Sequence, residues 1–257
     1  MQMKLKDWVT LGNLFCGMAS MAALLFDRFE LASFFILFGF VFDASDVLVA
    51  RLTKQFNKFG GELDNLCDMI SYSIAPGFLV FYAFYFKADY PMWAAGLLGF
   101  FPIAVGTIRA ARYNVRRASF PGFFVGLPRT AFALFMIALL NSALFQDLAD
   151  NLNNQAIYLI PAAMVFVISY MLISTRGFIS HHGPGWHGMI LWGTIFFLTS
   201  IPVGIVGGWL FLDDPNFIFD MLLFDLLIYM FVSDLFVPRQ IKVEYKAYIK
   251  EWLAQED

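Results

Sequence analysis

Long apolar runs separated by short polar stretches dominate the chain. A helix needs about 20 apolar residues to cross the hydrocarbon core of a bilayer, and about eight runs approach that length. The pattern predicts an all-α, polytopic membrane bundle with spans at residues 8–27, 30–50, 62–86, 91–112, 127–145, 157–174, 187–210 and 217–236. The polar stretch 146–156 is expected to be a loop, and residues 1–257 are expected to form a single integral-membrane domain.

Composition agrees with a membrane protein. Hydrophobic residues make up 60% of the chain and charged residues only 14%, whereas a soluble domain carries about a quarter charged residues. The net charge of −3 says little about partners, because the charges are segregated to the two sides of the predicted bundle. Membrane lipids are the expected surroundings, and no nucleic-acid partner is expected.

The basic residues predict the orientation. An even number of spans places both termini on one side, and a cytoplasmic N-terminus then puts every Lys and Arg except Arg28 and Lys87 inside. The positive-inside rule favours this arrangement. We therefore expect both termini and the polar ends of spans two and three to face the cytoplasm, in a cell (inner) membrane.

Four carboxylates lie at that cytoplasmic edge. Asp43 and Asp46 are spaced i, i+3, and Asp64 and Asp68 are spaced i, i+4, so that each pair shares one face of a helix. Ionised groups beside lipid are costly unless they have partners, which makes them candidates for a functional site. One or two divalent cations would balance such a cluster, and its hard oxygen ligands favour magnesium, manganese or calcium over zinc.

The acidic pairs belong to a longer pattern, D-x2-D-x3-A-R-x8-G-x3-D-x3-D. This order resembles the signature of the CDP-alcohol phosphatidyltransferases, membrane enzymes that make phospholipids. Val47 stands where the family pattern has Gly. The resemblance implies transfer of a phosphatidyl group from CDP-diacylglycerol to an alcohol, release of CMP, and Mg²⁺ or Mn²⁺ as the cofactor.

The same resemblance implies roles for single residues. The four aspartates would ligate the metal, and Asp68 would also be the general base that takes the proton of the alcohol. Gly60 would let the nucleotide approach the backbone, and Arg51 would pair with an aspartate or a phosphate. Ala50 belongs to the same predicted substrate-binding segment.

Three further stretches resemble the serine-using branch of the family, the phosphatidylserine synthases. They are residues 10–17 (TLGNLFCG), 109–114 (RAARYN) and 124–128 (FVGLP). Residues 171–175 also fit that branch, so the family-like core is expected over 8–175, with two additional membrane helices in 187–236. Arg129 and Thr130 follow where the branch usually has Pro and small residues. Serine is therefore the predicted acceptor. A homodimer is the oligomeric state considered for the protein.

Several alternatives stay open at this point. Choline, inositol phosphate or glycerol phosphate could replace serine, and four membrane aspartates could instead form the pathway of an ion transporter. Arg109 and Arg112 could capture the lipid phosphate or a substrate carboxylate, or could simply anchor a helix end at the membrane interface. Asn13 could face the nucleotide or pair with a neighbouring helix.

Overall fold

The computed structural model is almost wholly helical, which confirms the predicted all-α class. It describes residues 3–53, 58–116, 118, 120–151, 154–180, 199–212, 214 and 216–254. The α-helices are α1 (Leu5–Leu25), α2 (Phe29–Thr53), α3 (Lys58–Met69), α4 (Ala75–Tyr82), α5 (Met92–Val115), α6 (Arg129–Asn141), α7 (Ala143–Asn151), α8 (Asn154–Ile157), α9 (Leu159–Ile173), α11 (Phe217–Leu227) and α12 (Arg239–Ala254). A further helix covers Thr199–Leu210.

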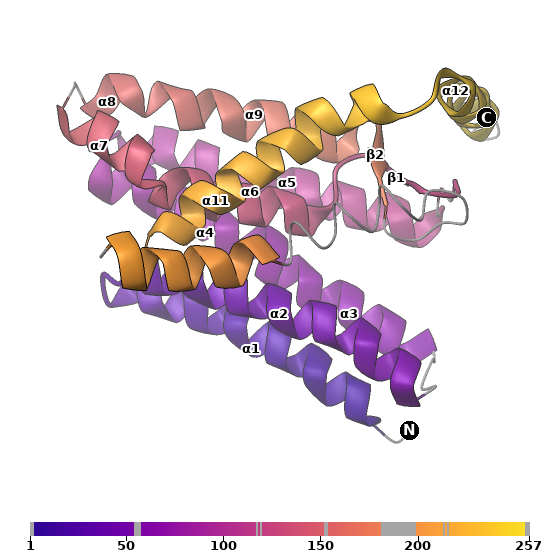
Figure 1. The fold of residues 1–257 in the computed structure, drawn as a ribbon, viewed down its shortest axis with the longest axis horizontal. Coiled ribbons are helices and arrows are strands. Elements are labelled where there is room, and N and C mark those ends of the chain that lie inside the picture. The colour runs from indigo at the N-terminus through magenta and orange to yellow at the C-terminus, as the bar shows by residue number, and fades with distance from the viewer. Residues whose placement is uncertain are drawn as a thin grey trace.

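The first layer of the bundle consists of α1, α2 and α3 (Figure 1). Helix α3 continues through a π-helical turn, Ile70–Ile74, into α4, so that one long helix runs over Lys58–Lys87. Glycines let these helices approach closely. A Cβ atom on Gly17 of α1 would lie 2.5 Å from Ser71 Oγ, which is closer than real Cβ atoms come to such a neighbour. The Ser71 hydroxyl also donates to the Asn13 carbonyl at 2.9 Å, which fixes α1 against this turn.

The second layer contains α5, α6, α9 and α11 (Figure 1). Helix α6 is its centre, because every residue from Ala131 to Asn141 is buried. At one end of the bundle a short antiparallel ladder joins β1 (Phe123–Val125) to β2 (Gly177–Ile179), next to α12. The sequence pattern did not predict this ladder, because three-residue strands are too short to show an alternation of apolar and polar positions.

The predicted loop 146–156 is wrong, since α7 and α8 cover most of it. Helix α6 ends at Asn141, and the chain bends by 44° into α7. The Ser142 side chain accepts a hydrogen bond from the Phe145 amide at 3.3 Å, so a new helix begins here, inside the predicted span, and continues into the predicted loop.

Within the described residues, four helices are long and apolar enough to cross a membrane, or up to six if each bent pair counts as one span. They are Leu5–Leu25, Lys58–Lys87, Met92–Val115 and Gln155–Ile173, with the bent pairs Arg129–Asn141 plus Ala143–Asn151 and Phe217–Leu235 plus Arg239–Ala254. These helices indicate an integral membrane protein, while the count of eight spans stays a prediction. Half of the predicted seventh span, residues 187–198, lies outside the described residues.

Candidate active site

Three of the four predicted aspartates meet between α2 and α3. Asp43 comes from α2, and Asp64 and Asp68 come from successive turns of α3. Each offers a carboxylate oxygen, and these three oxygens all lie within 4.8 Å of one another. All three residues are half-buried, so the cluster is neither closed off nor fully solvated. The i, i+4 spacing on α3 produces this convergence, because it places both carboxylates on the face that meets α2.

Two residues from other helices hold Asp68. The Asn13 side-chain amide on α1 donates to Asp68 Oδ1 at 3.0 Å. Arg129 Nη2, at the first residue of α6, lies 3.6 Å from Asp68 Oδ2. Asn13 is completely buried, and the side chain of Arg129 is only 12% exposed. The two oxygens of this carboxylate are therefore oriented from opposite layers of the bundle, as a positioned acid–base group requires.

Asp46, the fourth predicted ligand, is not part of this three-carboxylate group. It is buried and faces α1, where the Thr10 hydroxyl donates to Oδ2 and Lys6 Nζ lies 3.9 Å from Oδ1. Its Oδ1 atom accepts no hydrogen bond from the described residues. Metal ligation by Asp46 stays a prediction, and in this geometry α1 holds its carboxylate.

The donor set fits a hard divalent cation. Asp43, Asp64 and Asp68 offer only carboxylate oxygens, the ligands that Mg²⁺ and Mn²⁺ prefer. Among the described residues, Arg129 is the basic side chain that forms an ion pair with this group, so negative charge is in excess. A divalent cation would remove that excess and draw the three oxygens together.

The remaining residues of the acidic pattern lie around this cluster. Ala50 and Arg51 follow Asp46 on α2, but their side chains lie outside the described residues, as does that of Val47. Gly60 is buried in the first turn of α3, one turn before Asp64. Substrate binding by Ala50, Arg51 and Gly60 therefore stays a prediction.

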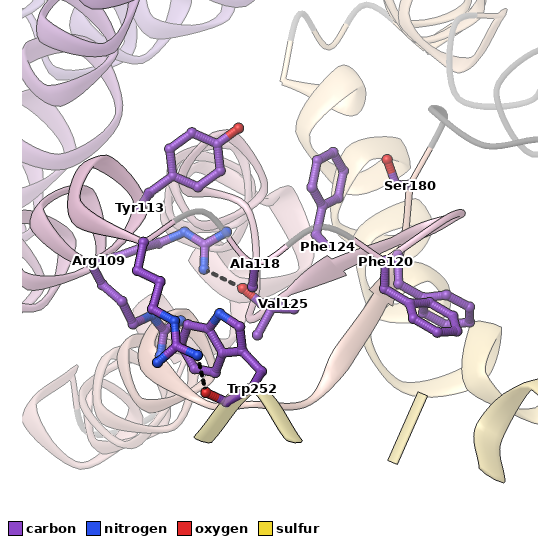
Figure 2. Close-up of a pocket in the computed structure, with 11 residues that line it drawn as sticks. Arg109, Tyr113, Ala118, Phe120, Phe124, Val125, Ser180 and Trp252 are labelled. Carbon is purple, nitrogen blue, oxygen red and sulfur yellow. Dashed lines mark hydrogen bonds between the residues drawn. The ribbon is translucent and has the colours of Figure 1, made fainter. Parts of the chain in front are cut away.

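Arg109 and Arg112, near the end of α5, lie in a different environment. Arg109 Nη1 donates to the main-chain carbonyls of Val125 and Leu172 at 3.0 and 2.7 Å, and Arg112 Nη1 donates to the Ile173 carbonyl at 2.6 Å. Both arginines line a cavity of about 100 Å³, of which Figure 2 shows Arg109 beside Val125. These contacts favour anchoring of the helix end, while substrate binding by either arginine stays a prediction.

Of the stretches that resembled the serine-using branch, 109–114, 124–128 and 171–175 form one structural unit around Arg109, whereas 10–17 lies on α1. Gly126 in the 124–128 stretch has φ +75°, and a Cβ atom there would lie 2.6 Å from Arg109 Nη1 and 2.5 Å from the Leu172 carbonyl oxygen. The Gly126 amide donates to the Arg176 carbonyl at 2.8 Å. Only glycine fits this left-handed backbone position under the guanidinium group.

Sequence reasoning did not identify two residues that join this unit to the aspartates. The Arg129 guanidinium donates to Asn65 Oδ1 at 2.6 Å, and the Asn65 amide donates to Asn114 Oδ1 at 2.6 Å. Asn114 ends the 109–114 stretch, and Asn65 follows Asp64 directly. The available signal was the position of Arg129, a cation at the start of an apolar span where the branch usually has Pro or a small residue.

The sequence matches the family model described as CDP-alcohol phosphatidyltransferase over residues 3–197. It is 33% identical over 130 residues to the CDP-diacylglycerol–serine O-phosphatidyltransferase of Helicobacter pylori. The aligned region covers 50% of this chain and 53% of that protein. It is 36% identical over 139 residues to the protein of the same name from Saccharomyces cerevisiae, which covers 48% of each. The chain thus spans about half the length of these two relatives. For the Methanocaldococcus jannaschii protein of that name, identity is 29% over 170 residues, or 66% of this chain and 71% of that protein.

Proposed function

Because the chain belongs to the CDP-alcohol phosphatidyltransferase family, we propose that it makes phospholipid by transferring the phosphatidyl group of CDP-diacylglycerol to the hydroxyl of serine. The observation that carries this proposal is the convergence of Asp43, Asp64 and Asp68, with Asp68 held by Asn13 and Arg129. The names of the relatives and the three branch-like stretches support serine as the acceptor. Choline, inositol phosphate and glycerol phosphate are the acceptors that an assay must compare with it.

In the proposed reaction the serine oxygen attacks the phosphorus on the lipid side of the pyrophosphate. A new bond forms between that oxygen and phosphorus, and the bond between the same phosphorus and the oxygen of CMP breaks. CMP leaves with the bonding electron pair, and the proton of the serine hydroxyl passes to the Asp68 carboxylate. Asn13 and Arg129 keep that carboxylate oriented toward the acceptor.

The other aspartates would hold the metal. Asp43 and Asp64 would share a divalent cation with Asp68, and Asp46 would complete the predicted ligand set. A bound Mg²⁺ or Mn²⁺ supplies charge neutralisation for the pyrophosphate and for the leaving CMP. Thr10 and Lys6 would fix Asp46 in place for this role.

The proposed orientation places this chemistry at the cytoplasmic surface of the cell (inner) membrane. The start of α1, the aspartate-bearing ends of α2 and α3, and α12 lie at the same end of the bundle (Figure 1). That agrees with both termini being cytoplasmic, where CDP-linked precursors and Mg²⁺ are found. A homodimer remains part of the proposal.

One experiment tests both the chemistry and the acceptor. Detergent-purified protein is supplied with CDP-diacylglycerol, MnCl₂ or MgCl₂, and a panel of labelled alcohols, and the release of CMP is measured. We expect release with serine, its loss in EDTA, and its return when either metal is added in excess. EDTA already saturated with Mg²⁺ is the matched control and should not inhibit. Full activity in free EDTA would exclude the metal mechanism, and turnover of another alcohol in place of serine would correct the acceptor.

A further inference from the structure

A cavity of about 980 Å³ lies between α9, the turn into β2, and α12. Its volume is at the upper end of the roughly 300–1,000 Å³ of small-molecule sites. One wall is apolar and comes from α9, while the opposite rim carries three basic side chains. The apolar wall includes Phe166, Val167 and Tyr170, and the basic rim consists of Arg176, Lys242 and Lys246.

The rim has an excess of positive charge. Asp234 is the carboxylate among the lining residues, so three cations and one anion leave a net charge of +2. Lys242 pairs with Asp234 at 3.1 Å. Within the described part of the chain, neither Arg176 nor Lys246 has a carboxylate within 4.0 Å; the Arg176 guanidinium instead lies over the Phe178 ring. Two cations therefore remain available to an anionic ligand.

The apolar wall belongs to a helix that can cross the membrane. The candidate span Gln155–Ile173 contains Phe166, Val167 and Tyr170, which remain 42%, 43% and 68% exposed. Arg176 follows three residues after the end of this span. The wall therefore lies at the depth of the acyl chains and the rim at the depth of the headgroups, where basic residues are expected.

Helix α12 packs tightly against the turn into β2 and so forms a fixed side of the cavity. The Tyr245 hydroxyl donates to the Thr175 carbonyl at 2.8 Å, and Tyr245 and Ile249 are buried. A Cβ atom on Gly177 would lie 2.9 Å from the Tyr245 ring, so β2 and α12 are in close contact. Helix α12 lies beyond residues 3–197, the part that matches the family, and no residue that lines the cavity belongs to the aspartate cluster.

We propose that this cavity binds an anionic phospholipid, with its phosphate at Arg176 and Lys246 and an acyl chain along the exposed face of α9. The ligand combines the two features that the cavity offers, a negative headgroup and an apolar tail. The site is separate from the aspartate cluster, so it does not depend on the proposed transferase activity.

The test measures lipid binding directly. Full-length protein in detergent is titrated with long-chain phosphatidylglycerol, and bound lipid is counted by native mass spectrometry. A cation near the membrane surface is worth about 1 kcal/mol, or about fivefold in affinity. We expect Lys246→Gln to weaken binding about fivefold and the Arg176→Gln, Lys246→Gln double variant about 25-fold. The single variant keeps the test valid if loss of Arg176 disturbs the turn.

The matched control is the Arg239→Gln, Lys250→Gln double variant. It removes two exposed cations of α12 that do not line the cavity, and it should bind phosphatidylglycerol as the unchanged protein does. Equal weakening in both double variants would show only general attraction and overturn the proposal. Equal binding of phosphatidylcholine, or full competition by inorganic phosphate, would also overturn it. Titration of the Asp68→Asn variant should give unchanged lipid binding, which separates this result from the fate of the proposed reaction.

Discussion

The aspartate cluster and the arginine-rich end of α5 use charge in opposite ways. At the aspartates, ionised side chains face one another, and the described cation beside them, Arg129, leaves negative charge in excess. At the end of α5, Arg109 and Arg112 face main-chain carbonyl oxygens instead. An excess of charge near the membrane calls for a ligand, whereas a cation surrounded by carbonyls already has its partners.

The main-chain carbonyls at the end of α9 explain why arginines stand at the end of α5. The last carbonyls of a helix have no partner within the helix, and a cation at this end also interacts favourably with the helix dipole. In α9 every carbonyl of the last turn has a donor from outside the regular helix. The donors are Ser174 for Tyr170, Leu127 and Ser174 for Met171, Arg109 for Leu172, and Arg112 for Ile173. The two arginines therefore cap the end of α9. The aspartates have no such set of partners among the described residues, so their carboxylate oxygens remain available to a ligand.

The largest effect is expected from a variant that disrupts the aspartate cluster. Asp68→Asn keeps the shape of the side chain but removes the proposed base, so CMP release should fall at least ~100-fold. The matched control is Asp150→Asn, an exposed carboxylate of α7 at the other end of the bundle, which should keep full activity. Thermal unfolding in detergent should show that both variants are folded. Ion flux into liposomes that depends on Asp68, with no CMP formed from any alcohol, would instead identify a transporter.

The next largest effect is expected from a variant that disrupts the structural unit around Arg109. Arg109→Gln removes a charged donor from the carbonyls of Val125 and Leu172, and hydrogen bonds to charged groups contribute about 1.5–3 kcal/mol each. We expect a lower unfolding temperature in detergent, with an unchanged KM for CDP-diacylglycerol in the protein that remains folded. Arg239→Gln, at an exposed position of α12, is the matched control and should leave both values unchanged. An unchanged unfolding temperature with a raised KM would assign Arg109 to substrate binding instead.

Sequence reasoning succeeded where the signal was local. The i, i+3 and i, i+4 spacings placed the aspartates on helix faces, and hydropathy located α1, α5 and α9 to within a few residues. It could not show that Asp46 turns toward α1 while Asp43 joins α3, because the two share one face of one helix. The contact of Arg129 with Asp68 joins helices that are far apart in the chain, and no periodicity within either helix encodes it.

A smaller effect tests the residue that links the two regions. Arg129→Gln removes the cation beside Asp68 and, because glutamine is shorter than arginine, also withdraws the donor to Asn65 Oδ1. Groups that orient a metal-binding or catalytic side chain contribute about tenfold at the low end, so we expect kcat to fall about tenfold with little change in KM for CDP-diacylglycerol. Arg129→Lys restores the charge and should recover part of kcat. Equal losses in the Gln and Lys variants would show that the fork of the guanidinium, rather than its charge, holds Asp68.

The smallest expected effect concerns the backbone beside the aspartates. A Cβ atom on Gly61 would meet nothing within 4 Å, so Gly61→Ala should stabilise α3 by up to about 1 kcal/mol. Its KM for CDP-diacylglycerol should not change. Gly60→Ala is the paired variant, because the resemblance implies that the nucleotide approaches the backbone there, and its KM should rise. If both variants keep the KM of the unchanged protein, the nucleotide does not approach Gly60, and the aspartates alone would hold the pyrophosphate through the metal. A rise for Gly61→Ala alone would shift the predicted contact by one residue, onto the open face of α3.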